Sequence, residues 1–148
     1  MPETGTPVLR PAAPDDAVGL VALCDQLGYP GMAGLIADRL AVLMADPEHH
    51  IHCAAQDGLL VGFAHLRLVR RLIRAHPVAL LDALCIDREY RGRGIGTRLL
   101  ACAEEQGRAW GCDRIELHSH QRRSGAHRFY ESHGYRDVPR YYVKELRA

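Results

Sequence analysis

The chain has 148 residues and a mass of 16.5 kDa, with 47% hydrophobic and 25% charged residues. We therefore expect one globular domain over residues 1–148. Lys and Arg number 19 against 18 Asp and Glu, a net charge of +1 that argues against a nucleic-acid binder held by bulk charge. No apolar run approaches the ~20 residues of a membrane helix, and the N-terminus lacks the regions of a secretory signal.

The cysteines indicate a reducing compartment. There are five, an odd number, and none forms a C-x-x-C pair, so neither a disulfide framework nor a zinc knuckle is expected. We expect a cytoplasmic protein whose cysteines pack as small core hydrophobes. His49, His50, His52 and Cys53 resemble a metal cluster, but no fourth ligand is positioned, so no metal site is expected.

The first half of the chain is expected to hold a strand, two helices and a hairpin. Apolar periodicity and helix-end signals give these ranges: strand 8–10, helix 14–27, helix 33–45, strand 51–56 and strand 59–68. Gly28 is expected to end the first helix, and Asp57-Gly58 to form the hairpin turn.

The second half predicts three more strands and two helices. The ranges are strand 77–86, helix 97–110, strand 114–118, helix 124–133 and strand 141–146. The strand over 77–86 is apolar apart from Asp82, which is typical of a central strand buried on both faces. The complete order is β-α-α-β-β-β-α-β-α-β, which predicts a mixed α/β sheet.

A glycine-rich turn joins the strand over 77–86 to the following helix. It reads Arg91-Gly92-Arg93-Gly94-Ile95-Gly96. With so little side-chain bulk, several main-chain N–H groups can face one concavity at a helix N-terminus, which predicts a diphosphate site. Neither the Walker motif nor the dinucleotide-binding fingerprint fits, because Thr97-Arg98 follows the last glycine. A turn without a ligand is the alternative.

These residues resemble the signature [Q/R]-x-x-G-x-[G/A] of the GNAT superfamily of acyl-CoA-dependent N-acyltransferases. A second block, from Ala126 to Tyr135, is similar to that family's A-x-x-x-[F/Y]-Y-x-x-x-G-[F/Y]. The likeness covers nearly the whole chain in the right order. It implies a single-domain α/β (α+β) fold, with a mixed, mostly antiparallel sheet flanked by about four helices.

The resemblance implies acetyl-CoA as cosubstrate, with no metal. An amide of Leu84 or Ile86 would polarise the thioester carbonyl. Where many relatives have Asn, this chain has Arg123, so contact with the CoA phosphates and exposure to solvent both stay open for it. The residues expected to bind CoA are Leu84, Cys85, Ile86, Arg91, Gly92, Arg93, Gly94, Ile95, Gly96, Thr97 and Arg123.

Two side chains are candidates for catalysis. The resemblance places Tyr130 next to the sulfur of CoA, as the acid that protonates the leaving thiolate. The alternative is an aromatic residue packed beside Phe129. Asp82 is the candidate that accepts or relays a proton from the acceptor amine. It is the lone carboxylate in an apolar strand, where burying a charge without a partner is costly. Its alternative is an ion pair with Arg67 or Arg71.

The expected function is transfer of an acetyl group from acetyl-CoA to a primary amine of a small molecule or peptide. The amine attacks directly in a ternary complex, since no base is evident beside Cys85 for a covalent intermediate. Tyr29, Asp82 and His118 are the candidate substrate contacts, with His120 as a second histidine near the strand end. A non-catalytic acyl-CoA-binding module is the alternative. No nucleic-acid or membrane partner is expected, and a homodimer through the C-terminal strand is left open.

Overall fold

The structure is a computed structural model that describes residues 5–118, 124–138 and 142–147. Its contacts divide the chain into two compact units, one reaching to Leu117 and one beginning at His118. Each unit is described by itself below. The single domain expected over residues 1–148 stays a prediction.

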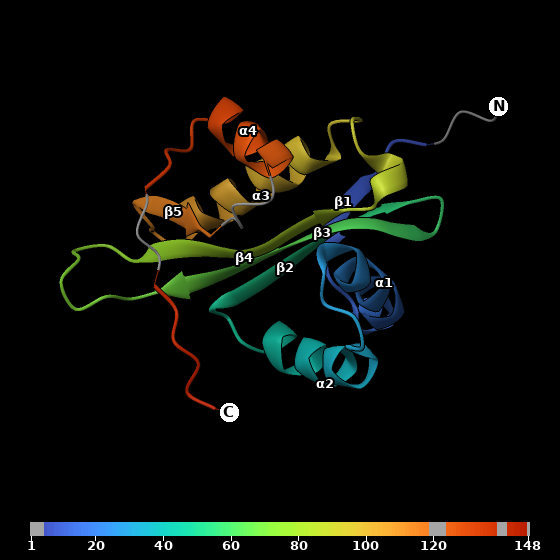
Figure 1. The fold of residues 1–148 in the computed structure, drawn as a ribbon, viewed down its shortest axis with the longest axis horizontal. Coiled ribbons are helices and arrows are strands. Elements are labelled where there is room, and N and C mark those ends of the chain that lie inside the picture. The colour runs from blue at the N-terminus through green and yellow to red at the C-terminus, as the bar shows by residue number, and fades with distance from the viewer. Residues whose placement is uncertain (1–4, 119–123, 139–141, 148) are drawn as a thin grey trace. The chain divides into compact units, whose positions relative to one another are not determined.

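The first unit contains one five-stranded sheet with the strand order β1-β2-β3-β4-β5 (Figure 1). The strands are β1 (Val8–Pro11), β2 (His49–Gln56), β3 (Leu59–Val69), β4 (Val78–Ile86) and β5 (Arg114–Leu117). Neighbours from β1 to β4 pair in antiparallel fashion, whereas β5 pairs with β4 in parallel. The predicted mixed and mostly antiparallel sheet is therefore confirmed.

Helices cover both faces of this sheet. They are α1 (Ala17–Leu27), α2 (Ala33–Met44) and α3 (Ile95–Ala109), with 3₁₀ turns η1 (Pro14–Asp16) and η2 (Arg88–Tyr90) before α1 and α3. Figure 1 shows α1 and α2 on one side of the sheet and α3 on the other. Of the described helices, none is long and apolar enough to cross a bilayer.

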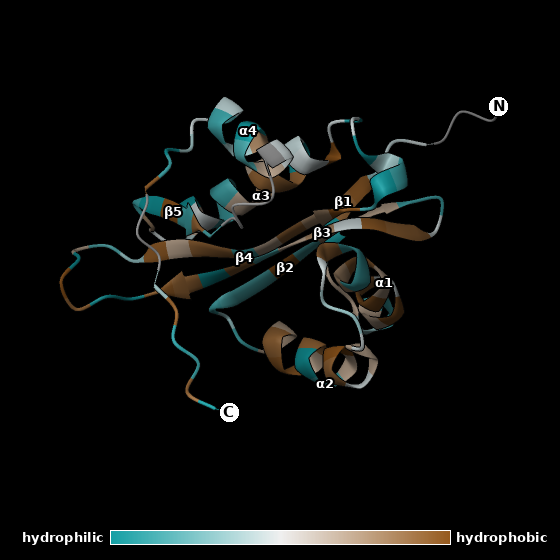
Figure 2. Ribbon diagram, viewed as in Figure 1, coloured by the Kyte–Doolittle hydropathy of each residue, from teal (hydrophilic) through white to brown (hydrophobic). Residues whose placement is uncertain are grey.

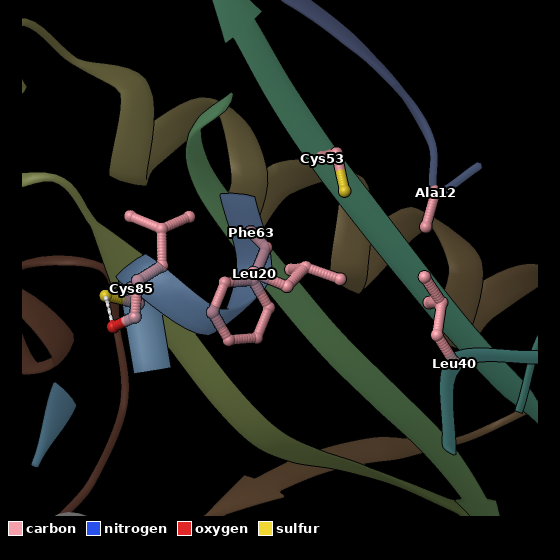
Figure 3. Packing of buried hydrophobic residues seen from close by; sticks show 7 residues of the cluster. Ala12, Leu20, Leu40, Cys53, Phe63 and Cys85 are labelled. Carbon is pink, nitrogen blue, oxygen red and sulfur yellow. Dashed lines mark hydrogen bonds between the residues drawn. The ribbon is translucent and has the colours of Figure 1, made fainter. Parts of the chain in front are cut away.

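The core on the α1 and α2 side is built from leucines and small strand residues (Figure 3). Leu20 and Leu40 of the two helices meet Cys53, Phe63 and Cys85 of β2, β3 and β4, and all five are buried. All five cysteines of the chain are free thiols. Cys53 and Cys85 thus pack as the core hydrophobes that the sequence predicts.

The opposite face depends on a close approach between the sheet and α3. A Cβ on Gly62 of β3 would lie 2.9 Å from Ile86 Cδ1 and 3.2 Å from Leu99 Cδ1. A Cβ on Gly107 of α3 would lie 3.2 Å from the Cβ of Ala79. Glycine at both positions lets α3 pack directly on β3 and β4, which fixes where the helix begins.

The second unit contains α4 (Ser124–Ser132). The strand expected over 141–146 was wrong over its described part, since residues 142–147 form no strand. Tyr142, Val143 and Leu146 are exposed at 86%, 65% and 91%. Alternating apolar residues predict a strand only when a neighbouring strand supplies hydrogen bonds and covers one face, and the sequence does not show that neighbour.

Two half-buried imidazoles on the α3 side make stability depend on pH. His50 and His52 lie 4.3 Å apart between ring centroids, and His50 Nε2 and His52 Nδ1 are buried without a hydrogen-bond partner among the described residues. Burial lowers the pKa of both side chains below the usual 6.5. Protonation is therefore easier in the unfolded chain. The free energy of unfolding keeps its full value above pH 6.5, where both imidazoles are neutral in both states, and it falls as the pH drops below 6.5.

We expect the loss of melting temperature between pH 7 and pH 5 to be smaller in His52→Leu than in the wild type. Leucine cannot take up the proton that the unfolded histidine binds, and it leaves no orphaned nitrogen. Thermal melts in a pH series measure the difference. An equal loss in both proteins would show that these imidazoles do not contribute to acid sensitivity.

Candidate active site

The glycine-rich turn presents main-chain amides at the start of α3. Gly92 and Gly94 have φ angles of +78° and +82°, a conformation that favours glycine. A Cβ on either would meet no atom within 4 Å. In the described part of the chain, the amides from Gly92 to Gly96 donate no hydrogen bond, while Arg98 N donates to Gly94 O at 3.1 Å. The turn is thus an open cradle of donors that fits a diphosphate.

This cradle is tied to α1 by one glutamine. Gln26 Nε2 donates to Asp87 Oδ2 at 3.2 Å, and Gln26 Oε1 accepts from the amide of Arg88 at 3.0 Å. Asp87 Oδ1 accepts from the amide of Glu89 at 2.9 Å, which caps η2. Gln26 was not predictable from the sequence, because a polar residue near the end of an amphipathic helix carries no signal of its distant partner.

Two arginines of the turn region border a cavity of about 290 Å³. Arg93 stacks over the Tyr90 ring at 4.8 Å, and Arg98 donates to the carbonyl of Pro7 at 2.9 Å. The lining residues are Gly5, Thr6, Pro7, Gln56, Arg93 and Arg98. Both guanidinium groups border this cavity, so the charge there is positive.

The strand before the turn has a free edge beside the cradle. Among the described residues, β5 pairs with β4 only from Val78 to Leu81. The amide of Asp87 donates to Val61 of β3 at 2.8 Å. Because main-chain groups alternate sides along a strand, those of Leu84 and Ile86 face away from β3 toward the free edge. Arg91 Nε donates to Ile86 O at 3.1 Å, in agreement with this direction.

Asp82 lies where this free edge begins. The pairing of β3 with β4 shifts between His65 and Leu66, and Asp82 is the extra residue of the resulting bulge. Bulges redirect side chains and are common next to active sites. Asp82 Oδ2 accepts from Arg67 Nε at 2.8 Å, so the predicted ion pair with Arg67 is present. Among the described residues no donor contacts Oδ1, which leaves that oxygen available.

His65 lies next to Asp82, and His49 lies next to His65, an arrangement that the sequence did not predict. His65 Nδ1 is 4.0 Å from Asp82 Oδ2, and His65 Nε2 is 2.9 Å from His49 Nδ1. Figure 2 shows that β2 begins with hydrophilic residues, whereas β4 is largely hydrophobic. Burial lowers the pKa of His65, while the charge of Asp82 raises it. His65 is therefore mainly neutral at pH 7 and able to accept a proton.

In the second unit, the end of α4 fixes the backbone at Tyr130. Gly134 has a φ of +87° and donates to Glu131 O at 3.1 Å, and Tyr135 N donates to Tyr130 O at 3.0 Å. These bonds form the glycine-closed Schellman end of a helix. The rings of Tyr130 and Tyr135 lie 5.6 Å apart. The spacing of residues in the block from Ala126 to Tyr135 is therefore the one that this helix end requires, and the helix end orients Tyr130.

The remaining predicted residues are placed as follows. Cys85 is buried, its thiol contacts Leu23 O at 3.4 Å on the α1 side (Figure 3), and its main-chain groups face Phe63 of β3 rather than the free edge. Tyr29 follows Gly28 and is 60% exposed. Thr97 lies in the first turn of α3, and His118 is exposed. Arg123 and His120 lie outside the described residues.

Other chemistry is not favoured by the described residues. Among them no group of three His, Cys, Asp or Glu side chains is placed to hold a metal ion. Burial raises the pKa of Cys53 to about 12 and also raises the pKa values of the Cys24, Cys102 and Cys112 thiols. These four thiols are therefore poor nucleophiles.

Comparisons with known proteins agree with this geometry. The sequence model of the acetyltransferase (GNAT) family matches residues 22–135. An aminoalkylphosphonate N-acetyltransferase of Salmonella typhimurium is 32% identical over 139 residues, covering 93% of this chain and 90% of the relative. An aminoglycoside N(6')-acetyltransferase type 1 of Stenotrophomonas maltophilia is 30% identical over 138 residues, covering 90% and 89%.

A solved structure shows the same fold. An aminoglycoside N-acetyltransferase in complex with CoA superposes with a TM-score of 0.85 at 18% identity, over 100% of this chain and 99% of that one. The prediction that the turn and the second block made is therefore confirmed. The chain belongs to the acetyltransferase (GNAT) family, and it is an N-acetyltransferase.

Proposed function

We propose that the protein transfers an acetyl group from acetyl-CoA to the primary amine of a small molecule, within one ternary complex. The observation that carries this proposal is the cradle of unbonded amides from Gly92 to Gly96 beside the free edge of β4. A diphosphate fits the cradle, and an extended pantetheine arm fits a strand edge whose main-chain groups need partners.

The chemistry then follows from the positions along that edge. The amide of Leu84 or Ile86 donates to the thioester oxygen as negative charge develops there. The amine lone pair forms the new N–C bond, the C–S bond breaks, and the electrons pass to sulfur. Tyr130 protonates the departing thiolate. Asp82 Oδ1 faces the acceptor amine and takes part in removing its proton.

The acceptor is proposed as a small amine. Two relatives are named for small amine acceptors, one an aminoalkylphosphonate and the other an aminoglycoside. Tyr29 and His118 remain proposed acceptor contacts, Arg123 a proposed CoA contact, and the homodimer is an open prediction. A peptide amine is the second class of acceptor to test.

The test is an acetyl-CoA-dependent screen over aminoalkylphosphonates, aminoglycosides, polyamines, amino acids and peptides, read as release of free thiol. Calorimetric titration with CoA is the parallel measurement of binding. At least one small amine should accelerate thiol release well above hydrolysis. CoA binding without acceleration by any amine would favour the non-catalytic acyl-CoA-binding module instead.

A further inference from the structure

Four side chains of the first unit lie in a row from the loop before β2 across β2, β3 and β4. We call it the histidine array, and its members in order are Asp46, His49, His65 and Asp82. Asp46 Oδ2 lies 4.0 Å from His49 Nε2, and His65 Nδ1 lies 4.0 Å from Asp82 Oδ2. Between these ends the two imidazoles are in direct contact at 2.9 Å. Both ring nitrogens of each histidine therefore face another member of the array.

Counting protons shows what the array can do. Its two imidazoles meet in one hydrogen bond, and their outer nitrogens each lie 4.0 Å from a carboxylate, an ion-pair distance and not a hydrogen bond. Two neutral imidazoles carry two N–H groups on four ring nitrogens. The pair can therefore take up one more proton, which places a single positive charge between two carboxylates.

We propose that the histidine array accepts the proton that the acceptor ammonium must lose before attack and passes it to solvent at the Asp46 end. This inference rests on the proposed function. The ammonium proton enters at Asp82 and His65, and the neutral amine then forms the N–C bond. The nitrogen loses a second proton as the amide forms, and this proton makes up for the one that Tyr130 gives to sulfur. His65 and His49 act through Asp82 and are positioning residues.

The surroundings of the array agree with this direction of transfer. The side chains of His65 and His49 are 18% and 22% exposed, against 30% for Asp82 and 45% for Asp46, so solvent exchange is easiest at Asp46. Arg67 Nε contacts the same Asp82 oxygen as His65 does, which leaves Oδ1 for the amine.

The groups that act on His65 come from the strands. They are His49 of β2, Arg67 of β3 and Asp82 of β4, and among the described residues α1 and α2 contribute no charge that acts on it. Asp82 favours the protonated ring, and the other two groups oppose it. The protonation state of His65 is thus set within the array and the Arg67 ion pair.

The test is the pH dependence of kcat/KM in His65→Gln and His49→Gln. Glutamine can keep a hydrogen bond but cannot carry the proton. In the wild type kcat/KM should fall as pH drops below the usual histidine pKa of 6.5. His65→Gln should lose about tenfold or more at pH 7 and show a changed acid limb, with unchanged CoA affinity. The matched control is His50→Gln, on the other face of β2, which should keep the wild-type profile.

An unchanged acid limb in His65→Gln would overturn the array while leaving the acetyltransferase activity intact. If instead no amine is acetylated by the wild type, the proposed function fails and the array is tested by NMR titration of the imidazoles. The pKa of His65 should then rise in His49→Gln, because the neighbouring imidazole lowers it. A titration of His65 that is the same in His49→Gln and the wild type would overturn the array.

Discussion

Gly94→Ala should weaken CoA binding at least tenfold, about 1.4 kcal/mol. Gly94 has a φ of +82°, and a Cβ there would meet no atom within 4 Å. An alanine there costs roughly 1–2 kcal/mol of backbone strain, and relief of that strain moves the amides to which the diphosphate is proposed to bind. Calorimetric titration with CoA measures the loss.

Gly111→Ala is the matched control. Gly111 has a φ of +81°, and a Cβ there also meets no atom within 4 Å. It lies past the other end of α3, about 22 Å away along a helix of 15 residues. Both variants should lose similar melting temperature, but only Gly94→Ala should lose CoA affinity. Equal CoA affinity in the two variants would contradict the cradle, and Gly92→Ala repeats the test at a second glycine.

Tyr130→Phe should lower kcat about 100-fold or more while CoA binding is kept. General acid catalysis by a positioned side chain typically contributes factors of this size, and phenylalanine cannot donate a proton. The substitution keeps the ring that packs 5.6 Å from Tyr135, so the end of α4 should be undisturbed. Steady-state kinetics with the best acceptor amine, together with CoA titration, measure the two quantities.

The control for this variant is Tyr142→Phe, which removes the hydroxyl of a tyrosine that is 86% exposed in the same unit. It should keep the wild-type kcat. Turnover by Tyr130→Phe at the wild-type rate would show that another group, or water, protonates the thiolate. Loss of CoA binding in Tyr130→Phe would indicate a binding role rather than an acid.

Helix ends were predictable because they depend on residues adjacent in sequence. Gly28, Gly111 and Gly134 each follow a helix and have positive φ angles, the conformation that favours glycine at this position. Asp57-Gly58 likewise forms the predicted hairpin turn, with φ angles of 51° and 78°. Local chemistry alone determines these features.

Helix starts were less accurate. The helix after the glycine-rich turn begins at Ile95 rather than Thr97, because Gly94 in the left-handed conformation caps it and the buried Ile95 anchors its first turn. Leu99, Leu100 and Ala103 of this helix are buried. A two-residue error at the start arises because a glycine reads equally well as part of a turn or as a cap.

The polar part of the candidate site depends on strand register, which the sequence did not specify. His49 and His65 are 16 positions apart and meet only because β2 and β3 pair as they do. Asp82 gains its direction from a bulge that exists only relative to β3. The sequence therefore indicated Asp82 as a carboxylate out of place in an apolar strand, but not the imidazoles beside it.

The most direct test is a crystal structure of the protein with coenzyme A. We expect diphosphate oxygens within hydrogen-bond distance of the amides between Gly92 and Gly96, with the pantetheine arm paired to the main chain of Leu84 and Ile86. A diphosphate bound elsewhere, with those amides unoccupied or donating to the protein itself, would contradict this expectation.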